Sequence, residues 1–371
     1  MTREVYDAII VGAGAAGIGT AIALRDAGLE NFLVLERHQV GASFDAWPKE
    51  TRFLTPSFPT NCMGMLDLNS IAIGASPAFS LQAEHPTGQQ YASHLRKLSQ
   101  ILNLPIKEQT TVLRITKIGD EFVIDTDNNT LRARHVVWAA GEFQYPRTIG
   151  FTGSESCQHT SMIHCYADLA GDDFIIIGGY ESGVDAAYHL ASRGLDVHLF
   201  DRECPWRVGT SDPSIALSLY SLQRMKEPCF QNHVTLHPDS PVRSVSHNGE
   251  TYEVTTEDDE QFSTSGQPIL ASGFLSSHLL VHDLFEHRPD GYPLLDHNDE
   301  STKVPGLFLC GPAVRHDDHV FCFIFKFRMR FAVVAKAIAT SLGLTAERLD
   351  EYRYHGMYLD DLACCGEECI C

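Results

Sequence analysis

Four cysteines lie within the last eight residues of this 371-residue chain, in the sequence C-C-G-E-E-C-I-C. An isolated cysteine usually packs as a small apolar residue, but this segment is polar and acidic. Clustered thiols can exchange disulfides or bind soft metal ions. We therefore identify this segment as the candidate catalytic group, which consists of Cys364, Cys365, Cys369 and Cys371.

Three interpretations of this cysteine tail are open. In a redox relay, electrons from elsewhere in the chain reduce a tail disulfide, whose thiolate then attacks a substrate disulfide or captures a thiophilic metal. In metal sequestration, the four thiolates bind a metal ion. A soft ion is the better candidate, because the spacing lacks the C-x-x-C pairs of structural zinc sites. In the third interpretation the cysteines are incidental to a disordered tail. We favour the relay and predict no resident metal site.

A redox tail needs an electron carrier, and the N-terminal segment predicts a site for one. Residues 6–11 form an apolar run typical of a buried strand, 15–27 have helical composition, and 32–36 read as a second strand. The turn between the first strand and the helix has the sequence G-A-G-A-A-G. A G-x-G-x-x-G turn between a strand and a helix is typical of dinucleotide-binding folds.

Each glycine of this turn has a physical role. Gly12 permits the tight turn, Gly14 lets a pyrophosphate approach the backbone, and Gly17 lets the helix pack closely on the strand. The pyrophosphate then lies at the helix N-terminus, where free N–H groups favour negative charge. Glu36 ends the second strand, where its carboxylate can accept hydrogen bonds from the adenosine ribose.

A second strand–turn–helix unit follows, with the turn G-G-Y-E-S-G at residues 178–183. We predict that it binds a second nucleotide through Gly178, Gly179, Ser182 and Gly183. Tyr180 replaces the middle glycine, so its side chain should hold the backbone away from a pyrophosphate or require a positive φ.

The order of the elements predicts an α/β fold in which one dinucleotide domain is inserted into another. β-Meanders are expected at 111–141 and near 252–274, after each nucleotide-binding unit. Small residues end the strands V-W-A-A-G and L-F-L-C-G, which come before and after the insertion. The predicted divisions are a first domain in two parts, an inserted domain between them, and a C-terminal helix with the cysteine tail. Their ranges are 1–148 and 277–344, 149–276, and 345–371.

The motif order GAGAAG, VWAAG, GGYESG, LASGF and GLFLCGP resembles the flavoprotein superfamily of thioredoxin reductases and flavin monooxygenases. The strings GASFDAWPKETRFLTPSF and GPAVRHDDHVFCFIFKFRMRFAVVAKAI resemble its bacillithiol-disulfide-reductase-like branch. The resemblance spans roughly residues 5–342 and implies FAD on the first fold and NAD(P)H on the second. The implied FAD contacts are Gly12, Gly14, Gly17, Glu36, Trp47, Gly141 and Gly311.

Two positions depart from the family pattern. Ala16 stands where that branch has a cysteine in the first turn, and Pro312 stands where many relatives have an aspartate. A thiol mechanism centred on the first turn is therefore not expected. In the second fold, D-R-E-C-P-W-R resembles the clasp for the 2′-phosphate in thioredoxin reductases, so Arg202 and Arg207 favour NADPH, with NADH as the alternative.

Composition limits the partners. Lys and Arg number 28 against 48 Asp and Glu, and the resulting charge of −20 argues against a nucleic-acid partner. Apolar runs are strand-sized rather than membrane-spanning, and the N-terminus enters a strand without a signal peptide. We therefore expect a cytoplasmic protein with no membrane partner, whose thiols are kept reduced.

The sequence thus predicts an FAD-dependent NAD(P)H oxidoreductase that passes electrons from flavin to a C-terminal cysteine pair. The expected substrate is a small-molecule or protein disulfide, or a soft metal ion bound by thiols, and a homo-oligomer is expected. The alternative enzymes are a flavin-dependent monooxygenase and an oxygen-using thiol oxidase. The alternative without catalysis is a metal-sequestering flavoprotein.

Overall fold

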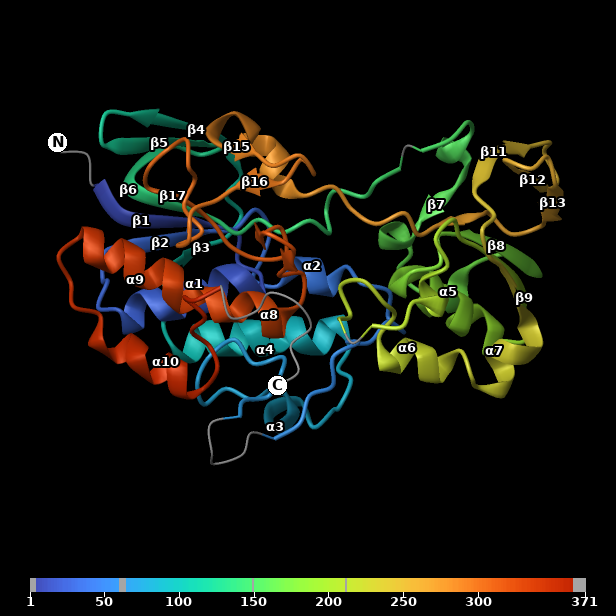
Figure 1. The fold of residues 1–371 in the computed structure, drawn as a ribbon, viewed down its shortest axis with the longest axis horizontal. Helices are drawn as coiled ribbons and strands as arrows, with labels where there is room; N and C mark the ends of the chain where they lie inside the picture. Colours follow the sequence, from blue (N-terminus) through green and yellow to red (C-terminus); the bar gives the residue numbers. More distant parts are fainter. Residues whose placement is uncertain (1–4, 60–64, 149, 211, 363–371) are drawn as a thin grey trace.

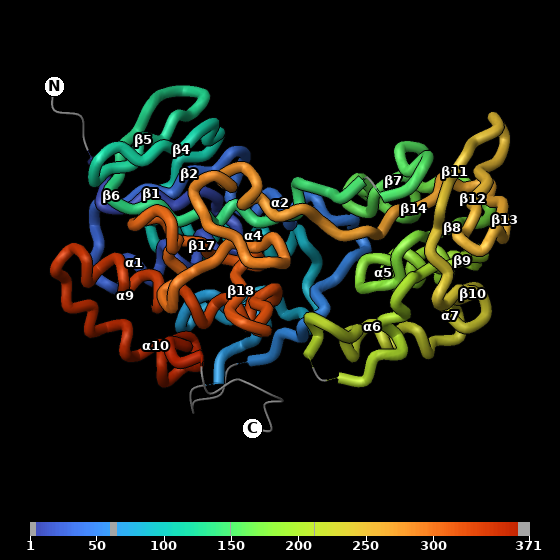
Figure 2. The backbone as a smooth tube through the Cα atoms, turned by 45° about the horizontal axis from the view of Figure 1, so that its top comes forward, coloured from blue at the N-terminus to red at the C-terminus, as the bar shows by residue number. Residues whose placement is uncertain are grey.

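The computed structural model describes residues 5–59, 65–148, 150–210 and 212–362. Two α/β domains lie side by side and are joined by two chain segments (Figures 1 and 2). The larger domain is formed by both ends of the described chain and the smaller by its middle. All four tail cysteines lie outside the described residues.

The first domain is built on a sheet of seven strands whose parallel part has the order β3-β2-β1-β6, with β17 beside β6. On the far side of β6 the strands β5 and β4 continue antiparallel, which is the expected meander. The bounds are β1 (Val5–Val11), β2 (Phe32–Leu35), β3 (Ile106–Lys107), β4 (Val112–Ile118), β5 (Glu121–Thr126), β6 (Thr130–Trp138) and β17 (Leu307–Leu309).

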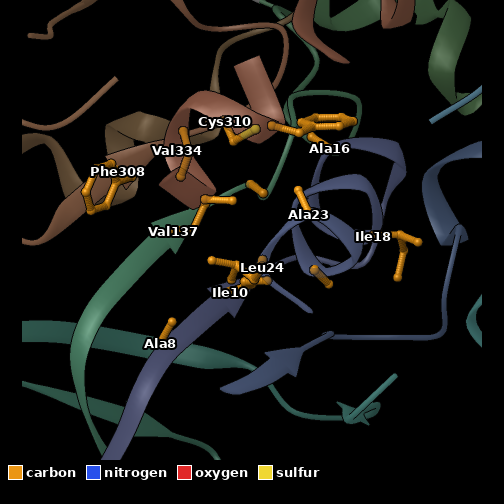
Figure 3. Packing of buried hydrophobic residues seen from close by; sticks show 14 of the residues in the cluster. Ala8, Ile10, Ala16, Ile18, Ala23, Leu24, Val137, Phe308, Cys310 and Val334 are labelled. Carbon is orange, nitrogen blue, oxygen red and sulfur yellow. The ribbon is translucent and has the colours of Figure 1, made fainter. Parts of the chain in front are cut away.

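Two helices pack against each other beside this sheet, α1 (Ala15–Asp26) and α9 (Phe331–Ser341). Figure 3 shows Val137 of β6 and Val334 of α9 in the apolar layer between the sheet and these helices. An added Cβ at Gly19 would lie 2.0 Å from the Phe331 ring. Only glycine allows the two helices to approach this closely, so α9 is held directly against the helix of the first glycine turn.

The second domain has a five-stranded parallel sheet of order β10-β9-β8-β14-β7. Three helices pack on one face, and an antiparallel sheet covers the other, with separate apolar cores on the two faces. The strands are β7 (Gln158–His159), β8 (Asp173–Ile177), β9 (Asp196–Phe200), β10 (Val234–His237) and β14 (Ile269–Leu270). The covering elements are α5 (Glu181–Ala191), α6 (Leu219–Arg224), α7 (Pro228–His233), β11 (Val242–His247), β12 (Tyr252–Thr256) and β13 (Gln261–Thr264).

The expected fold is confirmed, with small differences at the ends of elements. Helix α4 (Gly88–Ile101) begins with a capping box between Thr87 and Gln90. The apolar segment 324–341 is divided into α8 (Ile324–Phe327), a 3-10 turn and α9. Shorter elements are α2 (Ala42–Asp45), α3 (Pro77–Leu81), α10 (Asp350–Tyr354), and the pairs β15 (Glu286–His287) with β16 (Pro293–Leu294) and β18 (Arg315–His316) with β19 (His319–Val320). Within the described ranges, no helix is both long and apolar enough to cross a bilayer.

A buried charge cluster joins the C-terminal elements of the first domain. The Asp299 carboxylate lies 2.8 Å from Nη2 of Arg330 and 2.5 Å from Nε2 of His316, and all three residues are buried. Arg330 also donates to the carbonyl oxygens of His297 and Leu359. One guanidinium therefore fixes the loop before β17, the 3-10 turn after α8 and the segment that leads into the tail.

Replacing Arg330 with Met should lower the free energy of unfolding by about 3–5 kcal/mol, because Asp299 would remain buried without its guanidinium partner and with His316 alone beside it. The matched control is Arg114→Met, since Arg114 forms an exposed pair with Asp125 at 2.8 Å. That control should change stability by at most about 1 kcal/mol. Urea denaturation measures both, and equal midpoints for the two variants would contradict this role of Arg330.

Candidate cofactor and redox site

The first glycine turn is shaped by two close backbone approaches. Gly12 has a φ of +105°, and an added Cβ would lie 2.5 Å from the Ala139 carbonyl oxygen. An added Cβ at Gly17 would lie 1.9 Å from the carbonyl oxygen of Gly12. Gly14, the residue that caps α1, would have nothing within 4 Å of such a Cβ. Gly12 and Gly17 therefore pack the turn, while Gly14 leaves the helix N-terminus open.

Glu36 is positioned by this turn. Its carboxylate accepts hydrogen bonds from the backbone N–H groups of Ala13 and His38, both at 2.8 Å. The residue also lines a cavity of about 340 Å³ that contains Gly12 and Gly14. Carboxylate oxygens have further lone pairs that can accept from ribose hydroxyls. The position of Glu36 therefore fits the predicted role.

A second cavity of about 360 Å³ meets the first over the α1 N-terminus. The second cavity also contains Trp47 and Pro312, and α8 supplies part of its wall. Residues that line both are Gly14, Ser43, Ala139, Gly141, Phe143 and Ser161. A dinucleotide whose pyrophosphate lies at the α1 N-terminus would extend into both cavities. Gly311 does not line either cavity. Its φ is +111°, and an added Cβ would lie 3.2 Å from that of Ala16, which lines the second cavity.

The far wall of the second cavity comes from the inserted domain. Glu181, Ser182 and Asp185 of α5 line it, together with Tyr166. On the opposite side the Trp47 ring packs edge-on against Phe44, with centroids 5.3 Å apart. The cavity therefore lies between the two domains, and of the predicted second-fold residues Ser182 reaches it.

Three carboxyl groups line this interdomain cavity. Burial raises the pKa of Glu142, which nearby Arg315 opposes. Burial also raises the pKa of Glu181, although hydrogen bonds from Ser221 and Ser218 favour its ionised form. Burial disfavours ionisation of Asp185, but His189 and Arg224 lower its pKa to about 2. The cavity thus combines a fixed anion with two carboxyls that hold a proton more readily than usual.

Polar contacts join the two domains around the cavity. The Thr51 hydroxyl donates to Asp185 at 2.6 Å, and the Lys326 ammonium lies 2.5 Å from Asp212. Glu50 accepts from the Cys165 thiol at 3.0 Å. Each contact joins the first domain to the inserted one, so the domain arrangement itself forms the cavity.

The turn of the second fold repeats the first. Gly178 has a φ of +107°, and an added Cβ would lie 2.4 Å from the Ala271 carbonyl oxygen. An added Cβ at Gly183 would lie 1.8 Å from the Gly178 carbonyl oxygen. The Asp201 carboxylate accepts from the Gly179 N–H at 2.6 Å. These contacts match those of Gly12, Gly17 and Glu36, so the backbone has the form of a nucleotide-binding turn.

Tyr180 differs from Gly14 in its side chain and not in its backbone. Its φ and ψ are −81° and −166°, against −81° and −168° for Gly14. The expectation of a positive φ is therefore wrong. The Tyr180 hydroxyl donates to the carbonyl oxygens of Pro213 and Ala216. The side chain is thus held in place beside the α5 N-terminus, where the first fold has open space.

The two predicted phosphate-clasp arginines are exposed and paired. Arg202 lies 3.6 Å from Glu257, and Arg207 lies 3.1 Å from Asp239. A 2′-phosphate would have to replace a carboxylate at each side chain. Exposed pairs of this kind are worth little, about 0–1 kcal/mol, so the exchange would cost little.

The sequence did not single out Glu142, Glu181, Asp185 or Cys322 as site residues. An isolated cysteine such as Cys322 is expected to pack as a small apolar residue, yet Cys322 lines the second cavity. Its position directly before the apolar α8 run, in a string that matched the family, was the available signal. In the described part of the chain, no group of three or more His, Cys, Asp or Glu side chains is arranged to hold a metal ion.

Comparison with known proteins gives consistent matches. The model of the pyridine nucleotide-disulphide oxidoreductase family matches residues 9–311. Bacilliredoxin reductase Bdr of Bacillus subtilis is 24% identical over 344 residues, covering 90% of this chain and 97% of that protein. The uncharacterized oxidoreductase CzcO of Bacillus velezensis is 26% identical over 195 residues, or 50% of this chain. The latter match spans about half of that relative, 52% of its length.

Solved structures show the same fold. Bacillithiol disulfide reductase Bdr (YpdA) of Staphylococcus aureus has a TM-score of 0.75 at 19% identity, covering 92% of this chain and 99% of that one. A flavin-containing monooxygenase from Stenotrophomonas maltophilia has a TM-score of 0.70 at 18% identity, covering 92% and 100%. These similarities confirm the architecture of two dinucleotide folds.

Replacing Glu36 with Ala should weaken FAD binding about 10- to 100-fold, because a charged acceptor contributes about 1.5–3 kcal/mol. Titration of the apoprotein with FAD, followed by flavin fluorescence, measures the dissociation constant. Glu108→Ala is the matched control, since its carboxylate also accepts a backbone N–H, that of Val40, at 2.8 Å. Equal affinities for the two variants would exclude Glu36 as a ribose ligand.

Proposed function

Because the chain belongs to the pyridine nucleotide-disulphide oxidoreductase family, we propose that it is an FAD-dependent NAD(P)H oxidoreductase that reduces a disulfide through its C-terminal cysteines. The pair of joined cavities carries this proposal. One cavity begins at Glu36, the other ends at α8 and the inserted domain, and both include the open turn at Gly14.

The residues of the first fold fit FAD. Gly14 leaves room for the pyrophosphate at the α1 N-terminus, where unpaired N–H groups favour its charge. Glu36 accepts from the ribose, and Trp47 offers an apolar wall in the interdomain cavity. When bound, FAD supplies two-electron transfer between a nicotinamide and a disulfide. The contacts of Thr51 with Asp185 and of Lys326 with Asp212 hold the inserted domain beside this cavity.

We propose that the second fold docks the nicotinamide cofactor. Its turn has the required backbone, and Asp201 lies where the ribose acid of such a fold is expected. Arg202 and Arg207 favour NADPH over NADH, because they can replace their carboxylate partners with a 2′-phosphate. Tyr180 lowers the affinity, since its side chain lies beside the helix N-terminus.

In the proposed relay a tail thiolate attacks the substrate disulfide and forms a mixed disulfide, and the leaving thiolate takes a proton. A second tail thiol then releases the reduced substrate and leaves a tail disulfide. The electron pair of the nicotinamide restores two thiols. The candidate cysteines are Cys364, Cys365, Cys369 and Cys371, and the segment before them is fixed by a hydrogen bond from the Leu359 N–H to the Met329 carbonyl oxygen.

The similarity to a protein named bacilliredoxin reductase favours a small-molecule or protein disulfide as the substrate. A soft metal ion bound by thiols is the second substrate class, because the same thiolates suit it. The homo-oligomer remains a prediction from the sequence.

A second candidate is an oxygen-using thiol oxidase, in which substrate thiols reduce the flavin and no nicotinamide is needed. The fixed Tyr180 side chain favours this candidate. Flavin monooxygenases share the fold, and NADPH consumption with oxygen but without thiol change would identify that activity.

Anaerobic mixing with NADPH should reduce the flavin and produce new thiols in the full chain. A chain truncated before Cys364 should show the same flavin reduction without the thiols. Stopped-flow absorbance and rapid thiol counting follow the two events. Fast flavin reduction with an unchanged thiol count in the full chain would contradict the relay, and no reduction by NADPH or NADH would favour the thiol oxidase.

Replacing Tyr180 with Gly should tighten NADPH binding, because the α5 N-terminus becomes as open as that of α1. We expect a roughly 10-fold or larger decrease in the dissociation constant, the equivalent of about 1.4 kcal/mol. Nicotinamide fluorescence reports the binding. Tyr180→Phe is the matched control, since it removes only the hydroxyl. Tyr188→Gly is unsuitable, because Tyr188 lies within a helix. An unchanged affinity in Tyr180→Gly would show that nicotinamide does not dock at this turn.

A further inference from the structure

Electron transfer from a nicotinamide to a disulfide consumes one proton from outside the two reactants. A hydride carries an electron pair with one hydrogen nucleus, whereas the two thiols that a disulfide yields hold two protons. The interdomain cavity is the place where this proton is needed. Glu36 lies in the other cavity, where the adenosine ribose is expected, so the flavin end of the dinucleotide belongs to the interdomain one.

Six titratable side chains of the described residues line the interdomain cavity, and most of them cannot exchange a proton readily. They are Arg52, Glu142, Tyr166, Glu181, Asp185 and Cys322. An arginine stays charged in proteins. Burial raises the pKa of Tyr166 well above its ordinary value, so this phenol keeps its proton. Asp185 stays ionised, because its partners hold its pKa at about 2 in spite of its burial.

Glu181 and Cys322 are each held in one protonation state. The Glu181 carboxylate accepts hydrogen bonds from the Ser218 N–H and the Ser221 hydroxyl, both at 2.5 Å. Donors of this kind favour the ionised form of a carboxyl. Burial raises the pKa of the Cys322 thiol, although its hydrogen bond with Ser214 opposes the shift, so the thiol keeps its proton at neutral pH.

Glu142 is the remaining group, and its carboxyl is not held by hydrogen bonds. Among the described residues, none forms a hydrogen bond with this carboxyl. Burial raises the pKa of Glu142, and the charge of nearby Arg315 opposes that shift. The Arg315 guanidinium donates instead to the carbonyl oxygens of Pro312 and Val314, at 2.5 and 2.8 Å, and lies 4.3 Å from the Tyr292 ring centroid. Both carboxyl oxygens of Glu142 are therefore available to bind and release a proton.

The backbone that carries Glu142 is fixed at the cavity wall. Gly141, directly before it, has a φ of +67°, and its carbonyl oxygen accepts from the Ser277 N–H at 3.1 Å. The carbonyl oxygen of Glu142 itself accepts from the Tyr145 N–H at 2.8 Å. This turn keeps the partly buried Glu142 side chain on the cavity wall.

We propose that Glu142 is the residue that exchanges protons with the interdomain cavity during electron transfer. This inference rests on the proposed function. Glu142 binds a proton from solvent when the electron pair enters the cavity with the hydride. When the pair passes on to a disulfide, Glu142 gives this proton to one of the two thiolates, and the hydrogen nucleus of the hydride supplies the other. One hydride, one solvent proton and one disulfide thus yield two thiols.

The proposal predicts how many protons accompany reduction of the bound flavin. An electron pair that enters with one proton adds one negative charge to the cavity, and a nearby negative charge raises the pKa of a carboxyl. Between the pKa values of Glu142 in the oxidised and the reduced protein, the native chain should therefore bind two protons with each electron pair. Glu142→Gln should bind one.

The reduction potential of the flavin, measured anaerobically against a reference dye at a series of pH values, counts these protons. Each proton adds about 30 mV per pH unit for a two-electron couple, so the slope should fall from about 60 to about 30 mV per pH unit in Glu142→Gln. Glu142→Asp keeps a carboxyl and should restore the larger slope. Glu181→Gln is the matched control, because Glu181 lines the same cavity but is held by its serine partners.

A second measurement needs no variant. The absorbance of oxidised FAD bound to the native chain should titrate with a pKa above that of a free glutamate, about 4.3, because the Glu142 charge lies beside the flavin. The absence of such a titration would overturn the inference.

The outcomes separate the inference from the proposed function. A two-proton slope in Glu142→Gln with native FAD content would overturn the inference and leave the proposed function intact. Loss of the second proton in Glu181→Gln alone would also overturn it. A native chain that binds no FAD would overturn the proposed function, and the inference with it.

Discussion

The geometry of the site depends on the interactions of the Arg330 guanidinium. It pairs with buried Asp299, which in turn holds His316, and it donates to the Leu359 carbonyl oxygen. The same side chain thus positions the loop before β17, the chain after α8 and the root of the tail. Relative to an apolar cluster of the same volume, such a buried ion pair adds little net stability, although removing Arg330 alone leaves a buried carboxylate poorly paired. Its partners allow few other arrangements of these elements.

The two glycine turns show how one backbone solution can serve two binding roles. Gly12 and Gly178 have nearly equal positive φ values, and each faces a carbonyl oxygen from the neighbouring strand. The difference lies in one side chain, because Tyr180 covers what Gly14 leaves open. The first fold is therefore ready for a tightly held cofactor. Under the proposed function, the Tyr180 side chain lowers the affinity of the second fold for the nicotinamide cofactor.

The sequence predicted what depends on local pattern. Strand–turn–helix spacing identified both folds, and Glu36 followed from its distance to the first turn. The sequence did not predict the contacts that depend on domain docking. Asp185 contacts Thr51 and Cys322 contacts Ser214, and the residues of each pair are more than a hundred positions apart in the chain. Of the two alternatives for Tyr180, the positive φ is excluded, because the cap position has an extended conformation that any residue can adopt.

The central claim is that the flavin and the thiols of this chain form one electron-transfer system. Anaerobic titration of the oxidised, FAD-loaded chain with dithionite, followed by flavin absorbance, tests it most directly. The account predicts that complete reduction takes two electron pairs, one for the flavin and one for a disulfide, and that truncation before Cys364 removes one of them. A single electron pair for both the full and the truncated chain would contradict it.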